Sequence, residues 1–386
     1  MSPISNAFIE RSHVERPERF YPLHARVCEK CFLVQLEQFE PPQAHFGEDY
    51  AYFSSFSDSW LDHARRYVEM AIKRFSLGHA SQVIEIAAND GYLLQYFVKA
   101  RIPALGIEPA RNVAEAARAK GVETLTEFFG RSCAARLPKA DLLLGNNVLA
   151  HVPDLNDFVA GLKIALKPGG TITMEFPHLL TLMRENQFDT IYHEHFSYFS
   201  FLTAQAVFAA HALRLYDVER LTTHGGSLRI YACHSDDSSK KNSSKVDALV
   251  SEERNAGLDG IAAYRSFAEQ VKQTKRRLLE LLIPLKAAGK TIAGYGAPAK
   301  GNTLLNYCGV RADFVDYTVD RSPQKQGRLL PGTRIPVHAP ERIFETRPDF
   351  VLILPWNLKE EIMQQMRGIS AWGGRFIVPI PVPAIV

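Results

Sequence analysis

The sequence predicts an α/β protein built from two doubly wound domains, each with a mostly parallel sheet between helices. Short apolar runs of strand length alternate with amphipathic helical segments through the middle of the chain. The same alternation starts again after a charged, serine-rich stretch at residues 233–260. Alternation of this kind favours parallel sheets with helices on both faces. The length of 386 residues also exceeds that of one ordinary domain.

The first alternating unit contains the clearest strands and helices. We expect strands at 82–88, 102–108, 140–147 and 170–176, with helices at 91–100, 111–120 and 155–166 between them. The sequence LKPGG at 166–170 ends the last of these helices, because proline and glycine interrupt helical hydrogen bonding. A long helical pattern then follows at 264–289.

The second alternating unit occupies the end of the chain. It consists of strands at 290–296, 314–320, 349–356 and 375–381, with helices at 300–309 and 357–368. These patterns divide the chain into an N-terminal segment (1–65), a central domain (66–235), a helical linker (236–275) and a C-terminal α/β domain (276–386).

Composition and charge exclude several classes of protein. The 45 basic and 42 acidic residues give a formal net charge of +3, with no long basic run, so we expect no nucleic acid partner. The first residues lack a signal-peptide pattern, and no apolar run reaches about 18 residues, so we expect a cytoplasmic protein with no membrane partner. Five scattered cysteines do not suggest a disulfide scaffold.

The turn after the first predicted strand is a candidate cofactor site. The sequence VIEIAANDGYLL contains Glu85, Asn89 and Gly91, and the next strand ends at Glu108. The pattern lacks G-x-G-x-x-G, which disfavours a dinucleotide. A carboxylate at the end of the second strand can instead accept the ribose hydroxyls of an adenosine. The pattern resembles class I S-adenosylmethionine methyltransferases, in which Asn146 of NNVLAHVPD would lie near the cofactor.

Cys28 and Cys31 have the spacing of one half of a four-cysteine zinc site. A structural zinc ion needs four ligands, and neither His13 nor His24 shows paired ligand spacing. Zinc remains possible, but the sequence favours two reduced cysteines in a partial, zinc-module-like segment.

Two further motifs give the chain a family resemblance. YHEHFSYFS at 192–200 places histidines and a glutamate among aromatic residues, and GYGAPAKGNTLLNYCG at 294–309 is a glycine-rich strand-to-helix turn. Together with SPISNAF, RVCEKCFLVQL and DYAYFSSFSDSW, they make the chain similar to bacterial sugar C-methyltransferases, such as the TDP-ketodeoxysugar 3-C-methyltransferases. The resemblance covers nearly the whole chain. It implies S-adenosylmethionine as cofactor, a nucleotide-linked ketosugar as substrate, and a monomer or small homo-oligomer.

One departure from that family concerns zinc. Its members carry a further C-x-x-C upstream of the segment that resembles SPISNAF, and this chain begins where that segment begins. We therefore expect either a start assigned downstream of the true one or a member that has lost its zinc ion.

Methylating carbon requires a carbanion equivalent, which a base can generate by removing a proton beside a ketone. Such a site needs a base, a group that holds it, and donors near the developing oxyanion. The resemblance implies that His195 is the base and that Glu194 and Tyr192 shape the substrate pocket. His193 is the weaker candidate, with a role in substrate binding. On a strand His193 and His195 would share a face, but the irregular MRENQFD before them favours a loop.

Two other segments supply candidate substrate residues. The resemblance implies that a tyrosine of DYAYFSSFSDSW, Tyr50 or preferably Tyr52, reaches the sugar. Lys300 and Asn302 follow the glycine-rich turn, which could cradle a diphosphate through backbone N–H groups. Three readings stay open: a C-methyltransferase acting on a nucleotide-linked ketosugar, an O- or N-methyltransferase acting on a related sugar, and a catalytically idle cofactor-binding scaffold.

Overall fold

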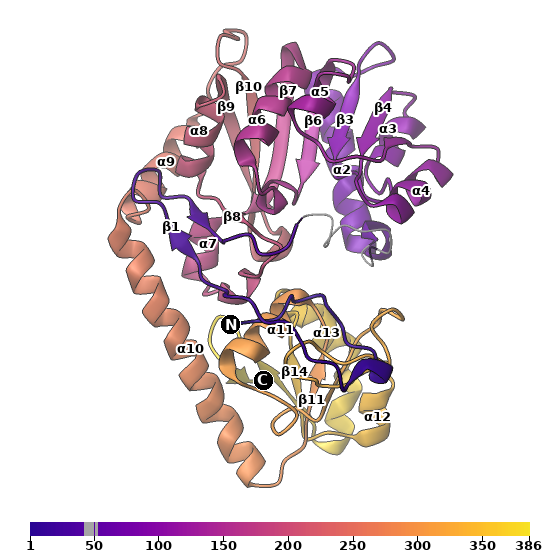
Figure 1. Cartoon of the computed structure of the whole chain (residues 1–386), viewed down its shortest axis with the longest axis vertical. Coiled ribbons are helices and arrows are strands. Elements are labelled where there is room, and N and C mark those ends of the chain that lie inside the picture. The colour runs from indigo at the N-terminus through magenta and orange to yellow at the C-terminus, as the bar shows by residue number, and fades with distance from the viewer. Residues whose placement is uncertain (42–49, 51–52) are drawn as a thin grey trace.

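The computed structural model describes residues 1–41, 50 and 53–386 and contains the two expected α/β domains (Figure 1). The central domain is built on a seven-stranded sheet in the order β5-β4-β3-β6-β7-β10-β9. The first five of these strands are parallel, whereas β10 pairs antiparallel with both β7 and β9. The strands are β3 (Val83–Ile86), β4 (Ala104–Ile107), β5 (Glu123–Leu125), β6 (Ala140–Asn146), β7 (Leu166–Pro177), β9 (Leu213–Leu221) and β10 (Ser227–His234).

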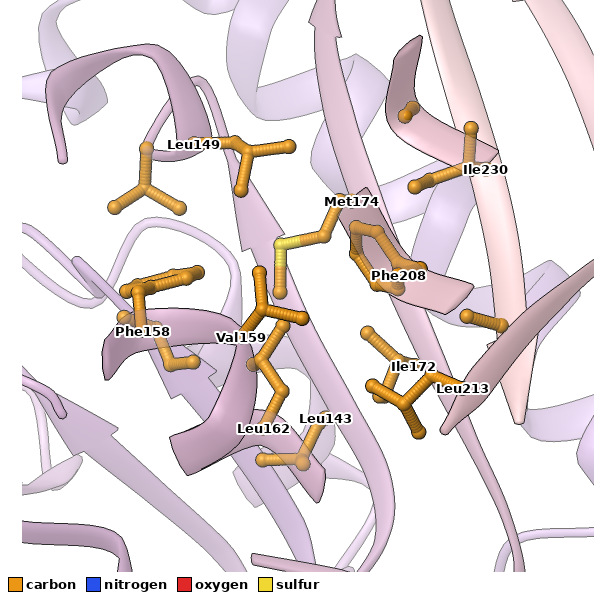
Figure 2. Packing of buried hydrophobic residues seen from close by; sticks show 14 of the residues in the cluster. Leu143, Leu149, Phe158, Val159, Leu162, Ile172, Met174, Phe208, Leu213 and Ile230 are labelled. Carbon is orange, nitrogen blue, oxygen red and sulfur yellow. The ribbon is translucent and has the colours of Figure 1, made fainter. Parts of the chain in front are cut away.

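Helices cover both faces of this sheet because its strands are apolar on both sides. On one face, Phe158 of α6 and Phe208 of α8 pack against Leu143 and Met174 of the strands (Figure 2). On the other face, Leu142 packs with residues of α2 and α3. The helices are α2 (Asp58–Phe75), α3 (Leu94–Lys99), α4 (Arg111–Ala119), α5 (Arg131–Ala134), α6 (Leu155–Ala165), α7 (Leu179–Arg184), α8 (Phe201–Ala209) and α9 (Ser244–Asn255).

The C-terminal domain holds a six-stranded sheet in the order β13-β12-β11-β14-β15-β16, parallel except for β16. Its strands are β11 (Ile292–Tyr295), β12 (Tyr317–Val319), β13 (Val337–His338), β14 (Phe350–Ile353), β15 (Arg375–Val378) and β16 (Ala384–Ile385). Its helices are α11 (Ala299–Cys308), α12 (Arg342–Thr346) and α13 (Lys359–Gln365), with 3-10 turns η6 (Trp356–Leu358) and η7 (Arg367–Trp372).

A single long helix, α10 (Ile261–Ala287), connects the domains along one side of the molecule (Figure 1). Leu278 and Leu282 of its second half are buried in the core of the C-terminal domain. The domain boundary expected after residue 275 therefore falls inside this helix, and the boundary expected after residue 65 falls inside α2. In the described ranges, no helix has both the length and the apolar character needed to cross a lipid bilayer.

The N-terminal segment contacts both domains. It contains the 3-10 turn η1 (Arg11–His13), and its strands β1 (Arg26–Val27) and β2 (Val34–Gln35) form an antiparallel sheet with β8 (Ser197–Tyr198) of the central domain. Nearer the start, Ile9 bridges to Leu329, and Arg334 Nε lies 2.8 Å from Glu18 Oε1. The segment therefore ties the C-terminal domain to the region around β8.

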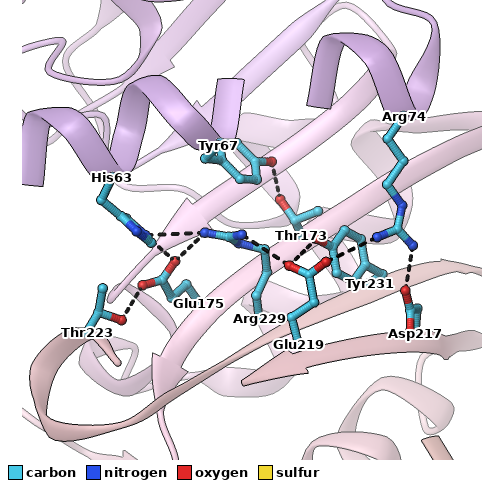
Figure 3. A network of polar contacts seen from close by, with 10 residues as sticks. All are labelled: His63, Tyr67, Arg74, Thr173, Glu175, Asp217, Glu219, Thr223, Arg229 and Tyr231. Carbon is cyan, nitrogen blue, oxygen red and sulfur yellow. Dashed lines mark hydrogen bonds and ion pairs between the residues drawn. The ribbon is translucent and has the colours of Figure 1, made fainter. Parts of the chain in front are cut away.

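A buried polar network holds α2 against the sheet (Figure 3). Arg229 of β10 lies 2.9 Å from Glu175 Oε2 and 3.3 Å from Glu219 Oε2, with its guanidinium 4.6 Å from the centroid of the Tyr67 ring. His63 of α2 lies 2.9 Å from the same Glu175 oxygen. Burial alone would raise the pKa of Glu175, but the His63 hydrogen bond and the Arg229 charge outweigh burial and lower it.

This network predicts unequal effects for two arginine substitutions. Arg229→Ala leaves the fully buried Glu175 carboxylate without its main countercharge, so we expect a loss of about 3–5 kcal/mol in the free energy of unfolding. Arg65→Ala is the matched control, because Arg65 pairs with Asp62 and Glu69 on the exposed face of α2, where ion pairs add little to stability, so its loss should be far smaller. Urea denaturation followed by circular dichroism measures both, and equal losses would contradict the assignment.

Candidate active site

The turn after β3 is the candidate cofactor-binding turn, and its backbone is unusual. Ala87 and Asn89 have positive φ values of 57° and 49°, and Gly91 has a φ of 74°. Non-glycine residues in this conformation are strained and concentrate at functional sites. A Cβ atom at Gly91 would lie 3.0 Å from Val122 Cγ2, so the close approach of this turn to the residue before β5 also favours glycine.

Glu108 follows β4 and braces this turn. Its Oε2 accepts a hydrogen bond from the Asn89 N–H at 3.0 Å, and its Oε1 accepts one from the Ala110 N–H at 2.9 Å. Burial raises the pKa of Glu108, although both backbone donors favour the ionised form. Each carboxylate oxygen can accept more than one hydrogen bond, so the oriented group retains acceptor capacity for the hydroxyls of a ligand.

Glu85 and Asn146 approach the same turn from neighbouring strands. Glu85 of β3 is fully buried, and burial raises its pKa well above the ordinary value despite a hydrogen bond from Tyr92. Asn146, the last residue of β6, donates from Nδ2 to the Tyr92 hydroxyl at 3.2 Å. Glu85 thus has no exposed surface.

The N-terminal segment contacts the cofactor turn and the helix α4 that lies beside it. The backbone N–H of Ser54, in the 3-10 turn η2 (Ser54–Phe56), donates to Asn89 Oδ1 at 2.8 Å. Asn112 Nδ2 donates to the Tyr50 carbonyl at 2.9 Å. Tyr52, the preferred tyrosine of this segment, lies outside the described residues.

The YHEH motif forms a β-turn, consistent with the irregular sequence before it. The His195 N–H donates to the Tyr192 carbonyl at 2.9 Å, and the two rings lie 4.1 Å apart. His195 Nδ1 lies 3.0 Å from the Thr190 carbonyl oxygen. Because a carbonyl oxygen can only accept, Nδ1 carries the proton and Nε2 keeps a lone pair. Burial and the nearby charge of His151 lower the pKa of His195 well below its usual value.

His151 is a second histidine that sequence reasoning did not select. It ends the 3-10 turn η3 (Leu149–His151), and its ring centroid lies 4.6 Å from that of His195. His151 Nδ1 is 2.8 Å from the Glu194 carbonyl oxygen. The sequence did indicate a place near the site for His151, because NNVLAHVPD follows directly after a strand that ends at the cofactor turn.

The turn directs its middle residues away from His195. The Glu194 carboxylate accepts two hydrogen bonds from Asn6 Nδ2, at 2.8 and 3.1 Å, and burial raises its pKa to about 7. His193 Nε2 lies 3.2 Å from the Pro22 carbonyl oxygen, with its ring edge-on to Tyr21. The structure therefore brings Tyr192 and His195 together, whereas Glu194 and His193 face the N-terminal segment.

Lys300 reaches the site from the C-terminal domain. It lies in the first turn of α11, with Nζ bonded to Asn357 and 4.5 Å from the Trp356 ring. Burial lowers the pKa of Lys300 to about 8. The charge of Lys300 also contributes to the lowered pKa of His195, after burial and the charge of His151.

Asp189 is the acidic neighbour of this lysine. It lies in the 3-10 turn η4 (Phe188–Thr190), and its Oδ2 accepts a 2.8 Å hydrogen bond from the Trp356 indole N–H. Burial raises the pKa of Asp189 to about 7, while Lys300 opposes that rise. Asn302, by contrast, is fully buried, and its Nδ2 lies 3.5 Å from the Ser5 carbonyl. Asn302 thus contacts the N-terminal segment rather than the region around His195.

Cys28 and Cys31 lie in the turn between β1 and β2. Two backbone hydrogen bonds close this turn: the Cys28 N–H donates to the Leu33 carbonyl at 3.0 Å, and the Phe32 N–H donates to the Cys28 carbonyl at 2.8 Å. Among residues 1–41, 50 and 53–386, no group of three or more histidine, cysteine or acidic side chains is arranged to hold a metal ion. Two thiols supply only half of the four ligands that a structural zinc ion requires.

Three family models match this chain. A C-methyltransferase C-terminal domain matches residues 222–381, a methyltransferase domain matches residues 60–215, and a model described as "Putative zinc binding domain" matches residues 1–46. The chain is also 37% identical to the C-methyltransferase NovU of Streptomyces niveus over 373 residues, which cover 96% of this chain and 88% of that protein.

Two solved structures each match less than half of this chain. Magnesium protoporphyrin IX methyltransferase from Synechocystis PCC 6803, with bound SAH, is 14% identical with a TM-score of 0.38 and covers 45% of this chain and 83% of that one. A SAM-dependent methyltransferase from Aquifex aeolicus is 17% identical with a TM-score of 0.35 and covers 42% of this chain and 87% of that one.

The raised pKa of Glu194 predicts a pH-dependent contribution to stability. In the folded protein Glu194 keeps its proton up to about pH 7, compared with an ordinary pKa of 4.5. Between these values the folded state binds more protons than the unfolded state, so this group lowers stability as pH rises. Relative to Glu194→Gln, the wild type should lose on the order of 3 kcal/mol between pH 4.5 and pH 8, at about 1.36 kcal/mol for each pH unit that separates the two pKa values.

Urea denaturation of the wild type and Glu194→Gln across this pH range measures the difference. Glu37→Gln is the matched control, because Glu37 lies exposed on the same N-terminal segment. Parallel stability curves for the wild type and Glu194→Gln would show that the carboxyl group is not held protonated.

Proposed function

The chain belongs to the family of bacterial C-methyltransferases, and we propose that it methylates a carbon atom of a nucleotide-linked ketosugar through an enolate. Methyltransferase and C-methyltransferase domains together span residues 60–381, and the chain is an S-adenosylmethionine-dependent methyltransferase. The observation that carries the enolate mechanism is the hydrogen bond from His195 Nδ1 to the Thr190 carbonyl. It leaves Nε2 unprotonated in a group whose pKa is lowered, as a general base requires.

The cofactor turn has the chemistry that an adenosine ligand requires. Glu108 would accept the ribose hydroxyls, and the turn at Asn89 and Gly91 would lie against the ligand, with Asn146 at the neighbouring strand end. When bound there, S-adenosylmethionine supplies an electrophilic methyl group.

The groups around His195 suit removal of a proton beside a ketone. His195 Nε2 takes the proton, while the Thr190 carbonyl holds the ring and stabilises the positive charge that it gains. Tyr192, whose ring lies 4.1 Å from that of His195, carries a hydroxyl that can donate to the developing oxyanion. His151 borders the same imidazole at 4.6 Å. Glu194 supports the turn through Asn6 rather than by contacting the base.

Lys300 is the proposed contact for the nucleotide portion of the substrate. It carries a cationic group in a largely buried position beside Trp356, whose indole N–H bonds to Asp189 in the turn that precedes the YHEH motif. A diphosphate would replace part of the hydration that Lys300 loses on burial. Asn302 is fully buried, so its side chain would not contact the diphosphate.

Replacing the base tests the reaction class. We expect His195→Asn to lower methyl transfer by about 10²- to 10⁴-fold, because Asn lacks a basic nitrogen but can still donate to the Thr190 carbonyl. Mass spectrometry on a panel of nucleotide-linked 4-ketohexoses, with S-adenosylmethionine in ordinary and deuterated water, measures methyl gain and proton exchange. Binding of S-adenosylhomocysteine, measured by calorimetry, should be unchanged.

Two outcomes would contradict this proposal. Methyl transfer by His195→Asn at the wild-type rate would remove the base assignment. A methylated product that keeps every hydrogen on the carbons beside the ketone would instead favour transfer to an oxygen or nitrogen atom of the sugar, because C-methylation replaces one of those hydrogens.

Replacing Lys300 tests the substrate contact. Lys300→Ala should weaken binding of a nucleotide-linked sugar by roughly tenfold to a hundredfold, as expected for the loss of a charged hydrogen bond. Lys359→Ala is the matched control, because Lys359 is half exposed in the same domain and pairs only loosely with Glu360. Calorimetric titrations with the sugar nucleotide and with S-adenosylhomocysteine separate the two ligands. Equal weakening of both would contradict the assignment.

A further inference from the structure

The short connection between β9 and β10 is held from several sides. It forms the 3-10 turn η5 (Thr223–Gly225), in which Thr223 Oγ1 donates to Glu175 Oε1 at 2.7 Å. Gln187 Nε2 donates to the Gly225 carbonyl at 2.7 Å. A Cβ atom at Gly225 would lie 2.9 Å from the Trp356 ring, so this turn fits closely against the C-terminal domain. The position of the residue between Thr223 and Gly225 is therefore imposed by its surroundings.

That residue is His224, and its backbone is strained. Its φ is 53°, a conformation that residues other than glycine adopt rarely. Such strain persists only where the surrounding structure imposes it, and it concentrates at functional sites. The imidazole lies 5.2 Å from the Trp60 ring, edge-on, and 2.7 Å from Asn147 Nδ2. Asn147 directly follows β6, at the edge of a parallel sheet where ligands bind.

The contact with Asn147 assigns the two nitrogens of the imidazole. Because the Asn147 amide nitrogen donates, His224 Nε2 must accept, and Nδ1 then carries the proton. Nδ1 of His224 makes no hydrogen bond to any residue in the described part of the chain, and the side chain is open to solvent. His224 thus presents a fixed N–H donor that is available to a ligand.

His224 shares its surroundings with the proposed reaction site. Protein atoms surround it closely enough for burial, followed by the charge of Lys300, to lower its pKa to about 4. The side chain keeps an accessible surface nonetheless, as expected for a group that faces space in which a ligand can bind. The charge of His224 in turn affects the pKa of His195. Both imidazoles also border the segment that follows β6, because His224 lies 2.7 Å from Asn147 and the His195 ring lies 4.6 Å from that of His151.

We propose that His224 Nδ1–H donates a hydrogen bond to the ketone oxygen of the acceptor and stabilises the enolate that His195 generates. This inference rests on the proposed function and adds a catalytic residue to it. When His195 Nε2 takes the proton, the electron pair of the C–H bond forms the C=C bond, and the carbonyl π pair moves to oxygen. The C=C pair would then form the new C–C bond to the methyl group of the cofactor, the oxygen pair would re-form the C=O bond, and the S–CH₃ pair would remain on sulfur.

A neutral imidazole suits this role better than an imidazolium ion. A neutral donor stabilises negative charge on oxygen without surrendering its proton, as neutral histidines do in other enolising enzymes. An imidazolium ion would protonate the oxygen and leave an enol, whose carbon is a weaker nucleophile. The tyrosine hydroxyl of Tyr192 can act with His224, because oxyanion sites commonly use more than one donor.

Two substitutions of His224 distinguish the effect of losing its N–H donor from the effect of relieving its backbone strain. His224→Asn tolerates a positive φ and keeps an N–H group near the position of Nδ1. His224→Gly also relieves the backbone strain but removes the donor. Solvent deuterium exchange at the carbon beside the ketone, measured with S-adenosylhomocysteine bound, reports enolate formation apart from methyl transfer.

We expect His224→Gly to lower exchange and methyl transfer by about 10²- to 10³-fold, the usual loss for an oxyanion donor. His224→Asn should retain activity within about tenfold, and both variants should bind S-adenosylhomocysteine as the wild type does. Near-normal exchange in His224→Gly, or equal losses in both variants, would overturn the proposal.

A measurement that needs no turnover keeps this inference distinct from the proposed function. Long-range ¹H–¹⁵N spectra, with the His224 signals identified by their loss in His224→Asn, report which ring nitrogen carries the proton. A neutral Nδ1–H form at pH 7 is expected, and an Nε2–H form would overturn the inference even if the wild type methylates ketosugars. A wild type that methylates no nucleotide-linked ketosugar, with this form present, would instead refute the proposed function and with it the role for His224.

Discussion

The buried carboxylate of Glu175 joins the core of the central domain to the candidate active site. On one side it pairs with Arg229 and His63, which fix β10 and α2 against β7. On the other it accepts the Thr223 hydroxyl, which holds the turn that carries His224. A fully buried carboxylate is costly unless it is paired and hydrogen-bonded, so these partners are constrained together. The position of a site residue is thereby linked to the packing of an entire helix and sheet.

Assembly of the site requires all three parts of the chain. The central domain supplies the cofactor turn and the β-turn with His195, and the C-terminal domain supplies Lys300 and the Trp356 ring. The N-terminal segment supplies Asn6, which bonds to Glu194, and the Ser5 contacts with α11. Because these contacts cross between segments distant in sequence, neither α/β domain alone contains the complete site.

Local sequence patterns predicted the parts of the molecule that local forces determine. The strands around Glu85 and Glu108 and the turn between them follow from apolar periodicity and small residues, and the structure contains them. His193 and Asn302 could not be placed in this way, because their surroundings are set by the N-terminal segment, to which both are turned. His151 was not predicted either, because only tertiary folding brings its ring to 4.6 Å from that of His195.

The pKa shifts in and around the candidate active site favour uncharged side chains. Burial lowers the pKa of His195 and His224, and it raises the pKa of Glu194 and Asp189 to about 7. Each shift favours the neutral form, because ions are poorly stabilised away from water. An enolate formed among neutral groups is stabilised by oriented N–H and O–H dipoles, which need no reorganisation during the reaction. Strong acids in that region would instead protonate the enolate before carbon could react. A site of neutral histidines beside one partly desolvated lysine is therefore suited to forming a carbanion equivalent while holding an anionic substrate.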